Sequence, residues 1–168
     1  MTDTTYLTEQ LDPQRHDRDS FRCDSVSLES YLKQQANQDR KRRIAVTYIL
    51  AHDKQIQGYY TLASTRVNLT DIPDQEAKKL PYYPALPAIL LGRLAVHIDS
   101  QGQGYGKTLL VDALKRSCEI SSLIGAFAVI VEAKDDQARA FYKHFGFIEL
   151  SHDPYHLFLP MKTIQTLF

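Results

Sequence analysis

The sequence predicts an α/β fold in which a layer of strands packs against helices. Runs rich in β-branched and aromatic residues alternate with segments whose apolar residues recur at helical spacing. The strand-like run at 89–96 leads through a glycine-rich break into a helical pattern over 109–114. Strands and helices in this order bury their apolar faces against one another in layers. A chain of 168 residues suits one domain, and no apolar run reaches the roughly 18 residues of a membrane span.

The N-terminal third predicts a short strand at 5–10, then a helix and a hairpin. Ser27 is a suitable N-cap, and the apolar residues at 28, 31, 32 and 36 would share one face of a helix that ends near Arg40. Residues 44–50 read as a buried strand because most are apolar and β-branched or aromatic. The turn Asp53-Lys54 would join it antiparallel to a second strand, which starts at Ile56 and runs towards Leu69.

Residues 71–87 carry four prolines and two adjacent tyrosines, and they predict a loop with a short helix at 74–79. Proline restricts the free chain and so stiffens such a segment. The loop is therefore either one wall of a substrate cleft or a rigid connector.

The C-terminal part predicts two helices, one buried strand and a final hairpin. The helix after the glycines should run to about Ile120, followed by a strand over 126–133. Asp135 or Asp136 can cap the next helix. The hairpin is expected at 147–150 and 157–160, with its turn at Asp153-Pro154, and the partly apolar tail 162–168 would pack on the domain or on a partner.

Charge and cysteine content exclude several classes of protein. The 20 basic and 20 acidic residues give a net charge of zero, which implies no bulk attraction to nucleic acid. Cys23 and Cys118 lack ligand-like spacing, as expected of reduced thiols in a cytosolic protein, and no signal peptide is visible. Pro154 lies between His152 and His156 and argues against a shared helix face, so we expect no metal site.

Two basic clusters interrupt this neutral background. They are the run Arg40-Lys41-Arg42-Arg43 and the group of Arg15, Arg18 and Arg22. Either these cations complement the dipole of a solvated helix end, or they contact a polyanion.

The strand, glycine-rich turn and helix over 89–114 are typical of a phosphate-binding site. Glycines let the backbone approach a ligand closely, and the first N–H groups of a helix attract anions. Two well-known patterns nevertheless fail: Gln101 stands where a P-loop needs glycine, and Lys107 stands where the dinucleotide fingerprint needs it.

A third pattern fits. Gln101-x-x-Gly104-x-Gly106 resembles the acetyl-CoA pyrophosphate loop of the GNAT N-acetyltransferase superfamily. Residues 135–147 resemble its N-x-x-A-x-x-F-Y-x-x-x-G-F helix, with Asp135 in place of the usual Asn. The resemblance implies one GNAT domain over residues 1–168, a central mixed, mostly antiparallel sheet with helices on both faces, and acetyl-CoA as the cofactor.

The same resemblance implies roles for individual residues. The pantetheine arm would pair with the backbone of Leu94, Ala95 and Val96, and Asp135 would make a further polar contact to the cofactor. The pyrophosphate would rest on the loop formed by Gln101, Gly102, Gln103, Gly104, Tyr105, Gly106 and Lys107. Tyr142 matches the motif tyrosine and would protonate the leaving thiolate, because a phenol keeps its proton at neutral pH; alternatively, Phe141 and Tyr142 are only core aromatics.

The sequence offers no clear general base. The central strand contains no glutamate, and its candidates are Arg93 and His97. A base is needed for a lysine side chain, with a pKa of about 10.4, but less so for an α-amine, with a pKa of about 7.7–8.0. The α-amine of aminoacyl-tRNA lies next to an ester, so its pKa should be lower still.

Longer motifs resemble one branch of the superfamily, the acetyltransferase toxins paired with ribbon-helix-helix antitoxins. The matching segments cover most of the chain and are 21–23, 28–32, 58–62, 86–88, 91–96, 133–135 and 157–161. Asp24 and His97 depart from the pattern, where the branch has Gly and Asp. This resemblance implies a cytoplasmic, homodimeric toxin that acetylates the α-amine of aminoacyl-tRNA and binds an antitoxin.

Phosphate contacts would then come from Arg40, Arg42, Arg43 and Arg93. Two alternatives remain open from the residues alone. One is the same chemistry on a small-molecule or protein amine, and the other is a non-catalytic module that binds acetyl-CoA or a partner.

Overall fold

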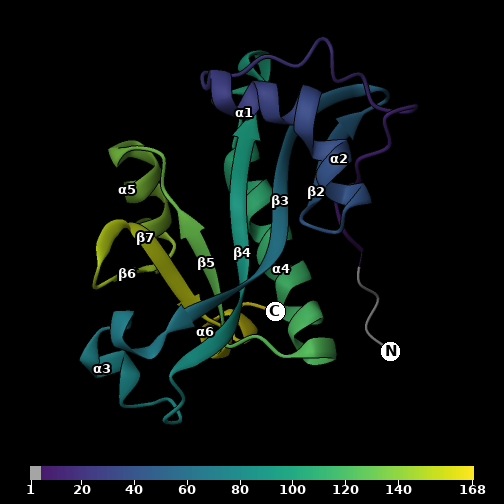
Figure 1. The fold of residues 1–168 in the computed structure, drawn as a ribbon. Helices are drawn as coiled ribbons and strands as arrows, with labels where there is room; N and C mark the ends of the chain where they lie inside the picture. Colours follow the sequence, from purple (N-terminus) through teal and green to yellow (C-terminus); the bar gives the residue numbers. More distant parts are fainter. Residues whose placement is uncertain (1–4) are drawn as a thin grey trace. The chain divides into compact units, whose positions relative to one another are not determined.

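The computed structural model describes residues 5–168 and has the predicted alternation of strands and helices (Figure 1). The strands are β1 (Glu9–Gln10), β2 (Val46–His52), β3 (Gln55–Asn68), β4 (Ala85–Val96), β5 (Ala128–Glu132), β6 (Ile148–Leu150) and β7 (Asp153–Pro160). The α-helices are α1 (Val26–Ser30), α2 (Ala36–Lys41), α3 (Asp74–Ala77), α4 (Tyr105–Ile124), α5 (Asp136–His144) and α6 (Met161–Gln165). A π-helix, η1 (Tyr31–Gln35), and two 3-10 turns, η2 (Leu69–Asp71) and η3 (Ile98–Ser100), complete the elements.

The sheet is mixed and mostly antiparallel, as the sequence predicted. Its seven strands follow the order β1-β2-β3-β4-β5-β7-β6. Strand β4 pairs in parallel with β5, whereas the pairs β1–β2, β2–β3, β5–β7 and β6–β7 are antiparallel. Among residues 5–168, no helix is both long and apolar enough to cross a membrane.

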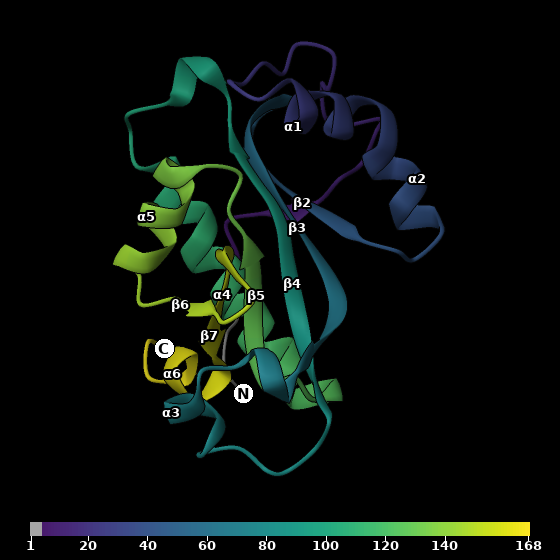
Figure 2. The same cartoon turned by 60° about the vertical axis from the view of Figure 1, so that its left-hand side comes forward.

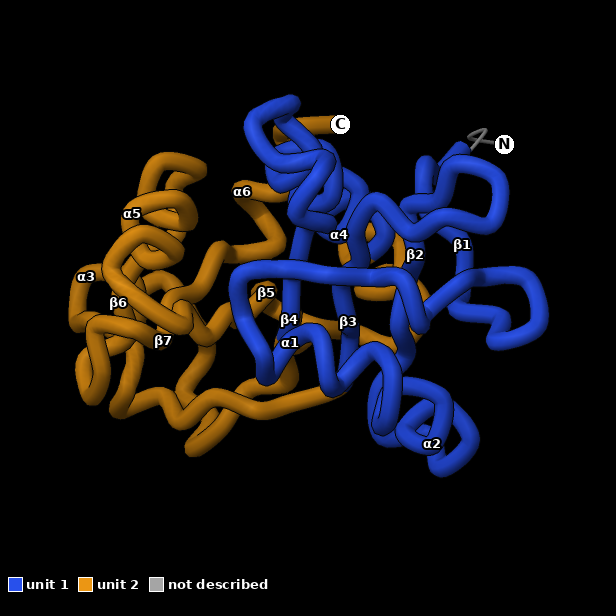
Figure 3. The backbone as a smooth tube through the Cα atoms, turned by 90° about the horizontal axis from the view of Figure 1, so that it is seen from above, with its two compact units in different colours: residues 1–63, 93–116 blue, residues 64–92, 117–168 orange. Residues whose placement is uncertain are grey.

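The chain divides into two compact units (Figure 3). Unit 1 contains Met1–Ala63 and Arg93–Arg116, and unit 2 contains Ser64–Gly92 and Ser117–Phe168. Strands β3 and β4 and helix α4 each contribute residues to both units. The single domain over 1–168 stays a prediction.

Helices cover both faces of the strands in unit 1, because side chains alternate along β2 and β3. Ile49 pairs with Tyr59, and both belong to a core with Leu32 and Ala36 of the N-terminal helical segment. The neighbouring pair, Tyr48 and Tyr60, points to the opposite face, where their rings stack 5.3 Å apart. This second face receives helix α4.

A buried carboxylate on α4 connects the helix to β3 and to the N-terminal segment. Asp112 accepts hydrogen bonds from the Thr8 hydroxyl (2.5 Å), the Tyr60 hydroxyl (2.7 Å) and the Leu7 amide (2.8 Å). One turn later, Arg116 donates to the Tyr60 hydroxyl (3.0 Å) and to the Thr8 carbonyl (3.1 Å). Both carboxylate oxygens of Asp112 therefore accept hydrogen bonds. A buried charge stabilises a fold only when it is satisfied in this way.

The N-terminal helical segment differs from the prediction in its cap and its regularity. Ser25, not Ser27, is the N-cap, and its hydroxyl accepts from the Leu28 amide at 3.2 Å. The segment is also interrupted by the π-helix η1, in which the Ala36 amide bonds to the Tyr31 carbonyl five residues back. Helical spacing alone does not reveal such an insertion, because the apolar face stays nearly continuous.

Unit 2 holds the parallel pair β4–β5 and the C-terminal hairpin. Its apolar core includes Val67, Ile130, Leu150 and Phe158. The predicted turn at Asp153-Pro154 is wrong: both residues belong to β7, and Ser151 and His152 form the turn. Proline is tolerated there because it lies near the first residue of a strand.

The remaining boundaries shift without changing an element's type. Strand β1 is shorter than predicted, helix α3 ends at Ala77, and helix α4 runs four residues past Ile120. The tail is helical over α6, whose Met161 and Ile164 are buried.

We predict that Gly58→Ala lowers the free energy of unfolding by about 1–3 kcal/mol, the usual cost of an overpacked core. A Cβ at position 58 would lie 2.8 Å from the Ala95 carbonyl oxygen and 2.8 Å from Leu109 Cδ1. Urea unfolding measures the change, and Ser64→Ala at an exposed position of β3 is the control. Equal stability of Gly58→Ala and wild type would show that α4 can move away from β3 at little cost.

Candidate functional site

The predicted pantetheine strand and pyrophosphate loop are continuous in unit 1. Leu94, Ala95 and Val96 end β4, with Ala95 buried in the core and its neighbours half-buried. The Gln101 side chain donates back to the Val96 carbonyl at 3.4 Å, so it ties the start of the loop to the end of the strand.

The loop is fixed at its base and depends on glycine at two positions. Ser100 bonds through its hydroxyl to the Gln57 side chain of β3 and through its amide to the His97 carbonyl (2.9 Å). Gly102 and Gly104 have φ of 80° and 82°, in the left-handed region that residues with a Cβ rarely enter. No atom lies within 4 Å of a Cβ built at either glycine, so backbone conformation rather than crowding selects glycine there.

The start of helix α4 offers backbone donors beside this loop. The Thr108 amide makes the first helical bond, to the Gly104 carbonyl at 3.1 Å. The three preceding amides, of Tyr105, Gly106 and Lys107, therefore have no acceptor in the helix. Residues 101–104 and Lys107 are exposed, whereas Tyr105 and Gly106 are half-buried. The helix amides and the Lys107 cation together suit a pyrophosphate.

Arg93 belongs to a polar cluster under the π-helix. Its guanidinium stacks on the Tyr31 ring, 3.5 Å from the centroid. The Tyr31 hydroxyl donates to Asp39 at 2.8 Å, and the Gln35 amide donates to the same carboxylate at 3.0 Å. Burial, with the hydrogen bond to Asp39, raises the pKa of Tyr31 to about 12, and the bonds from Gln35 and Tyr31 lower the pKa of Asp39.

The basic run at 40–43 is only partly available to a ligand. Arg40 is half-buried, and its Nη2 donates to Asn37 Oδ1 at 3.0 Å. Arg42 and Arg43 are exposed at the end of α2, where Arg43 adopts a φ of 60°.

The second basic group is bound locally. Arg15 pairs with Glu9 at 3.0 Å, Arg18 donates to the Lys33 carbonyl at 3.3 Å and Arg22 donates to the Asp19 carbonyl at 2.7 Å. These contacts favour a structural interpretation of this group.

His97, a candidate base, has both ring nitrogens engaged. Its Nδ1 accepts from the Arg22 amide at 3.1 Å, and its Nε2 faces Asp99 at 3.4 Å. The buried ring also packs against Phe21, with the centroids 5.6 Å apart. This histidine holds the N-terminal segment against the end of β4, and its Nδ1 lone pair is occupied by that hydrogen bond.

The other predicted residues lie in unit 2 on helix α5. Asp135 caps this helix, because its Oδ1 accepts from the Ala138 amide at 2.8 Å. Tyr142 is 6% exposed and packs edge-on against Phe141 and Phe147, at 5.3 and 5.4 Å. Burial raises the pKa of Tyr142 well above its ordinary value, so its hydroxyl stays protonated.

Helix α5 is anchored to strand β6 by ion pairs. Glu149 contacts Arg139 and, at 3.0 Å, Lys143, which lie one turn apart on α5. The hydrogen bond from Lys143, together with that from Arg139, lowers the pKa of Glu149. Sequence reasoning missed this anchor, although Arg139 and Lys143 at i, i+4 spacing mark one face of the helix.

Unit 1 thus gathers Arg93, the β4 backbone, the pyrophosphate loop and the basic run, whereas unit 2 holds Asp135 and Tyr142. Sequence reasoning also missed Gln57, which fixes Ser100, and the pair Tyr31–Asp39 beside Arg93. In the sequence, only the i, i+4 spacing of Gln35 and Asp39 indicates the polar cluster around Tyr31, Asp39 and Arg93.

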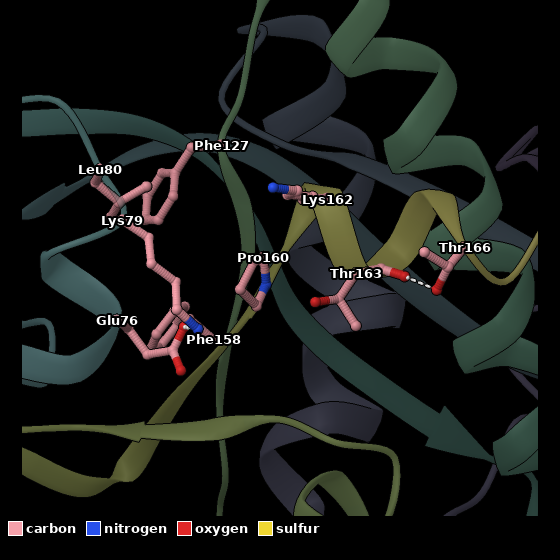
Figure 4. A pocket seen from close by; sticks show the side chains of 9 residues that line it. All are labelled: Glu76, Lys79, Leu80, Phe127, Phe158, Pro160, Lys162, Thr163 and Thr166. Carbon is pink, nitrogen blue, oxygen red and sulfur yellow. Dashed lines mark hydrogen bonds and ion pairs between the residues drawn. The ribbon is translucent and has the colours of Figure 1, made fainter.

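Neither hollow described in unit 2 contains a predicted site residue. The larger, of about 620 Å³, has an apolar floor of Phe127, Phe158 and Pro160, with Lys79 and Lys162 at its edges (Figure 4). Within residues 5–168, no group of three or more His, Cys, Asp and Glu residues could hold a metal ion, and neither cysteine forms a disulfide.

Comparison with known proteins gives consistent matches. Residues 43–149 match the family model described as an acetyltransferase (GNAT) domain. A tRNA-acetylating toxin of Mycobacterium tuberculosis (strain ATCC 25618 / H37Rv) is 38% identical over 148 residues, 88% of either chain.

Two solved structures cover nearly the whole chain. AtaT complexed with acetyl-methionyl-tRNAfMet is 33% identical with a TM-score of 0.87, over 96% of this chain and 98% of that one. A tyrosine-to-phenylalanine mutant of the AtaT toxin, bound to the C-terminus of the antitoxin AtaR and to acetyl-CoA, is 30% identical with a TM-score of 0.81, over 96% of both chains.

We predict that Glu149→Gln lowers the free energy of unfolding by about 1 kcal/mol at neutral pH, as expected for a partly exposed ion pair with two cations. The pKa of Glu149 is lowered in the folded state from its ordinary value of 4.5. Its contribution to stability is therefore fully present above pH 4.5 and is lost as the pH falls through the folded-state pKa. The difference between wild type and variant should therefore shrink in acid.

Urea unfolding at a series of pH values measures this difference. Glu132→Gln, which removes an exposed charge from β5 in the same unit, is the matched control. A difference that stays constant down to acid pH would exclude the ion pair as its cause.

Proposed function

The chain belongs to the acetyltransferase (GNAT) family, and we propose that it is a toxin which transfers the acetyl group of acetyl-CoA to the α-amine of aminoacyl-tRNA and so blocks translation. The observation that carries this proposal is the nearly full-length match to a tRNA-acetylating toxin. The match to AtaT with its acetylated initiator tRNA supports the same acceptor.

We assign the pyrophosphate of acetyl-CoA to the loop and helix start over Gln101–Lys107. The supporting features are the two left-handed glycines, the unpaired first amides of α4 and the exposed Lys107. The pantetheine arm would pair with the backbone of Leu94, Ala95 and Val96, and Asp135 keeps one carboxylate oxygen for a polar contact beyond its capping bond.

Tyr142 is the proposed general acid. The amine nitrogen attacks the thioester carbonyl carbon, the carbon–sulfur bond breaks, and the departing sulfur takes the proton of the phenol. The acetylated nitrogen releases its extra proton to solvent, from which the phenol is reprotonated. The raised pKa of Tyr142 agrees with this role, because the buried phenol keeps its proton throughout the neutral range and so has one to donate to the departing sulfur.

An α-amine acceptor agrees with the surroundings of Arg93 and His97, the two candidate bases, neither of which is free. Its pKa of about 7.7–8.0 or lower leaves much of it neutral at physiological pH. His97 is occupied by the Arg22 amide, and Arg93 is stacked on Tyr31 and cannot accept a proton.

Contacts to the tRNA phosphates are assigned to Arg42 and Arg43, which are exposed, with Arg40 and Arg93 as further candidates. The AtaT–AtaR complex supports a partner of the same kind, and we propose a ribbon-helix-helix antitoxin that binds this chain through its C-terminus. A cytoplasmic location and a homodimer complete the proposal.

The test of the acceptor is transfer of labelled acetyl groups from acetyl-CoA to a pool of charged tRNA, with uncharged tRNA and free amines in parallel. Label on charged tRNA alone is expected, and it would allow single isoacceptors to be compared next. Label on free amines but not on charged tRNA would refute the tRNA acceptor and leave a small-molecule acetyltransferase.

Tyr142→Phe should reduce kcat for acetyl transfer by about 100-fold or more, since positioned general acids contribute about 10²–10⁴. Its affinity for acetyl-CoA should stay close to that of wild type, because the hydroxyl alone is removed. The wild-type rate should not fall between neutral pH and pH of about 10 through loss of this proton.

Single-turnover kinetics and acetyl-CoA titration measure the two quantities. The control is Tyr155→Phe, which removes an exposed hydroxyl bonded to Asp136 in the same unit. Unchanged turnover of Tyr142→Phe would remove this tyrosine from the mechanism.

A further inference from the structure

The segment between helix α3 and strand β4 displays two tyrosines to solvent. Tyr82 is 96% exposed and Tyr83 is 59% exposed, although a tyrosine ring normally buries much of its surface. The segment lies in unit 2, in the loop that joins α3 to β4 (Figure 2). Rings held in water without a packing role within the chain suggest a ligand that stacks on them.

The backbone of this segment is ordered by its own bonds. The Tyr83 amide donates to the Pro81 carbonyl at 2.9 Å, and the Pro84 carbonyl accepts from the Leu69 amide at 3.0 Å. Pro81 and Pro84 also restrict the chain on either side of the two tyrosines. The rings are therefore presented from a fixed main chain, which lowers the entropy lost when a ligand binds.

A hollow of about 380 Å³ begins at the residue that follows Tyr83 in the chain. It is lined by Thr65, Arg66, Pro84, Ala85, Leu86 and Pro87, so Tyr83 is bonded to a residue of its wall. Arg66 is exposed, and no carboxylate of the described residues lies within ion-pair distance of it. The hollow thus combines an unpaired guanidinium with an apolar wall, and the chain leads directly from that wall to the two exposed tyrosines.

Acidic residues nearby limit the local positive charge. Glu76 pairs with Lys79 at 3.6 Å, and Asp71 faces His152 at 3.6 Å. Exposed Lys78 and Asp74 offset each other in charge. A ligand would consequently be held by the rings first and by Arg66 second, with little contribution from bulk attraction.

We propose that this surface, formed by Tyr82, Tyr83, Arg66 and the hollow beside them, binds unpaired nucleotides of the RNA substrate. The inference rests on the proposed function, since it names where the acceptor's RNA is contacted. Bases of single-stranded RNA stack on aromatic side chains and their phosphates pair with arginine, whereas bases inside a duplex are already stacked on one another. Two adjacent rings and one free guanidinium match that chemistry.

The first experiment measures binding of a fluorescent single-stranded oligoadenylate and of a charged-tRNA pool. The double variant Tyr82→Ala/Tyr83→Ala should weaken both by about 10-fold or more, and most of this loss should persist in high salt because stacking is not screened. Tyr82→Phe/Tyr83→Phe keeps the ring faces and should bind as wild type does. Arg66→Glu should weaken binding. It should also make the dependence of the logarithm of the binding constant on the logarithm of salt concentration less steep by about 0.7.

The second experiment measures KM and kcat for charged tRNA. The tyrosine variants should raise KM by a similar factor with little change in kcat. Lys54→Glu, at an exposed turn in unit 1, makes the same change of charge as Arg66→Glu and is the control. Because the side chains of Tyr82, Tyr83 and Arg66 are exposed, thermal unfolding should show that the variants are folded.

Several outcomes would overturn the inference. If wild type acetylates charged tRNA and the tyrosine variants keep its KM and RNA affinity, the proposed function survives and this surface is not an RNA site. If the tyrosine variants lost as much affinity for a blunt RNA duplex as for oligoadenylate, a preference for unpaired nucleotides would also be refuted. Variants that bind RNA normally but change the oligomeric state would reassign the surface to a protein contact.

The binding assay also separates this inference from the proposed function. Loss of oligoadenylate binding in the tyrosine variants would support the surface even if wild type failed to acetylate charged tRNA. Absence of wild-type binding to both RNAs would refute the surface directly.

Discussion

The close packing of helix α4 on strand β3 is the constraint on which unit 1 depends. Gly58 leaves no room for a Cβ between β3, the Ala95 carbonyl and Leu109, so the helix lies directly on the strands. The Asp112 and Arg116 contacts to Tyr60 and Thr8 then fix its position along the strand. Since the helix starts immediately after the glycine-rich loop, its position also determines where the loop's free amides point. The geometry of the proposed pyrophosphate site is a consequence of core packing as much as of the loop's own glycines.

Buried polar groups have different tasks in the two units. In unit 1, Asp112 and His97 are satisfied by partners from distant segments and hold the N-terminal region against the sheet, whereas Asp39 is satisfied by Tyr31 and Gln35 of its own helical segment. In unit 2, the polar anchor of α5 is the half-exposed Glu149, while Tyr142 is buried among aromatic rings with no hydrogen bond to its hydroxyl among the described residues. Desolvation without a partner is what keeps that phenol protonated, whereas the hydroxyls of Tyr31, Tyr59 and Tyr60 in unit 1 are bonded to neighbouring oxygens.

The proposed RNA acceptor would have to be recognised through local features, because the chain has no net charge. Most arginines of the N-terminal region are bound to carbonyls or carboxylates, which leaves few cations for phosphates. In the part of the chain that the structure describes, three arginines remain exposed and unpaired, and these are Arg42, Arg43 and Arg66. The solvent-facing rings of Tyr82 and Tyr83 add a surface on which bases can stack. Recognition by stacking and by a few fixed cations would favour shape and unpaired bases over bulk charge, and it would reduce competition from other polyanions.

The sequence by itself determined the order of the strands and of most helices, the strand–glycine–helix unit and the acetyltransferase resemblance, because these rest on local periodicity and on residues close together in the chain. It also identified Asp135 as a possible cap, since the capping bond spans only three residues. It misplaced the cap at Ser27 and the turn at Asp153-Pro154, and it did not reveal the π-helix, because neighbouring serines and a strand-edge proline satisfy local rules equally well. The Asp112 network, the Gln57–Ser100 bond and the free rings of the proline-rich segment were decided by tertiary structure alone. Each depends on which distant segments bury a side chain or leave it exposed, and a pattern of neighbouring residues carries no information about those partners.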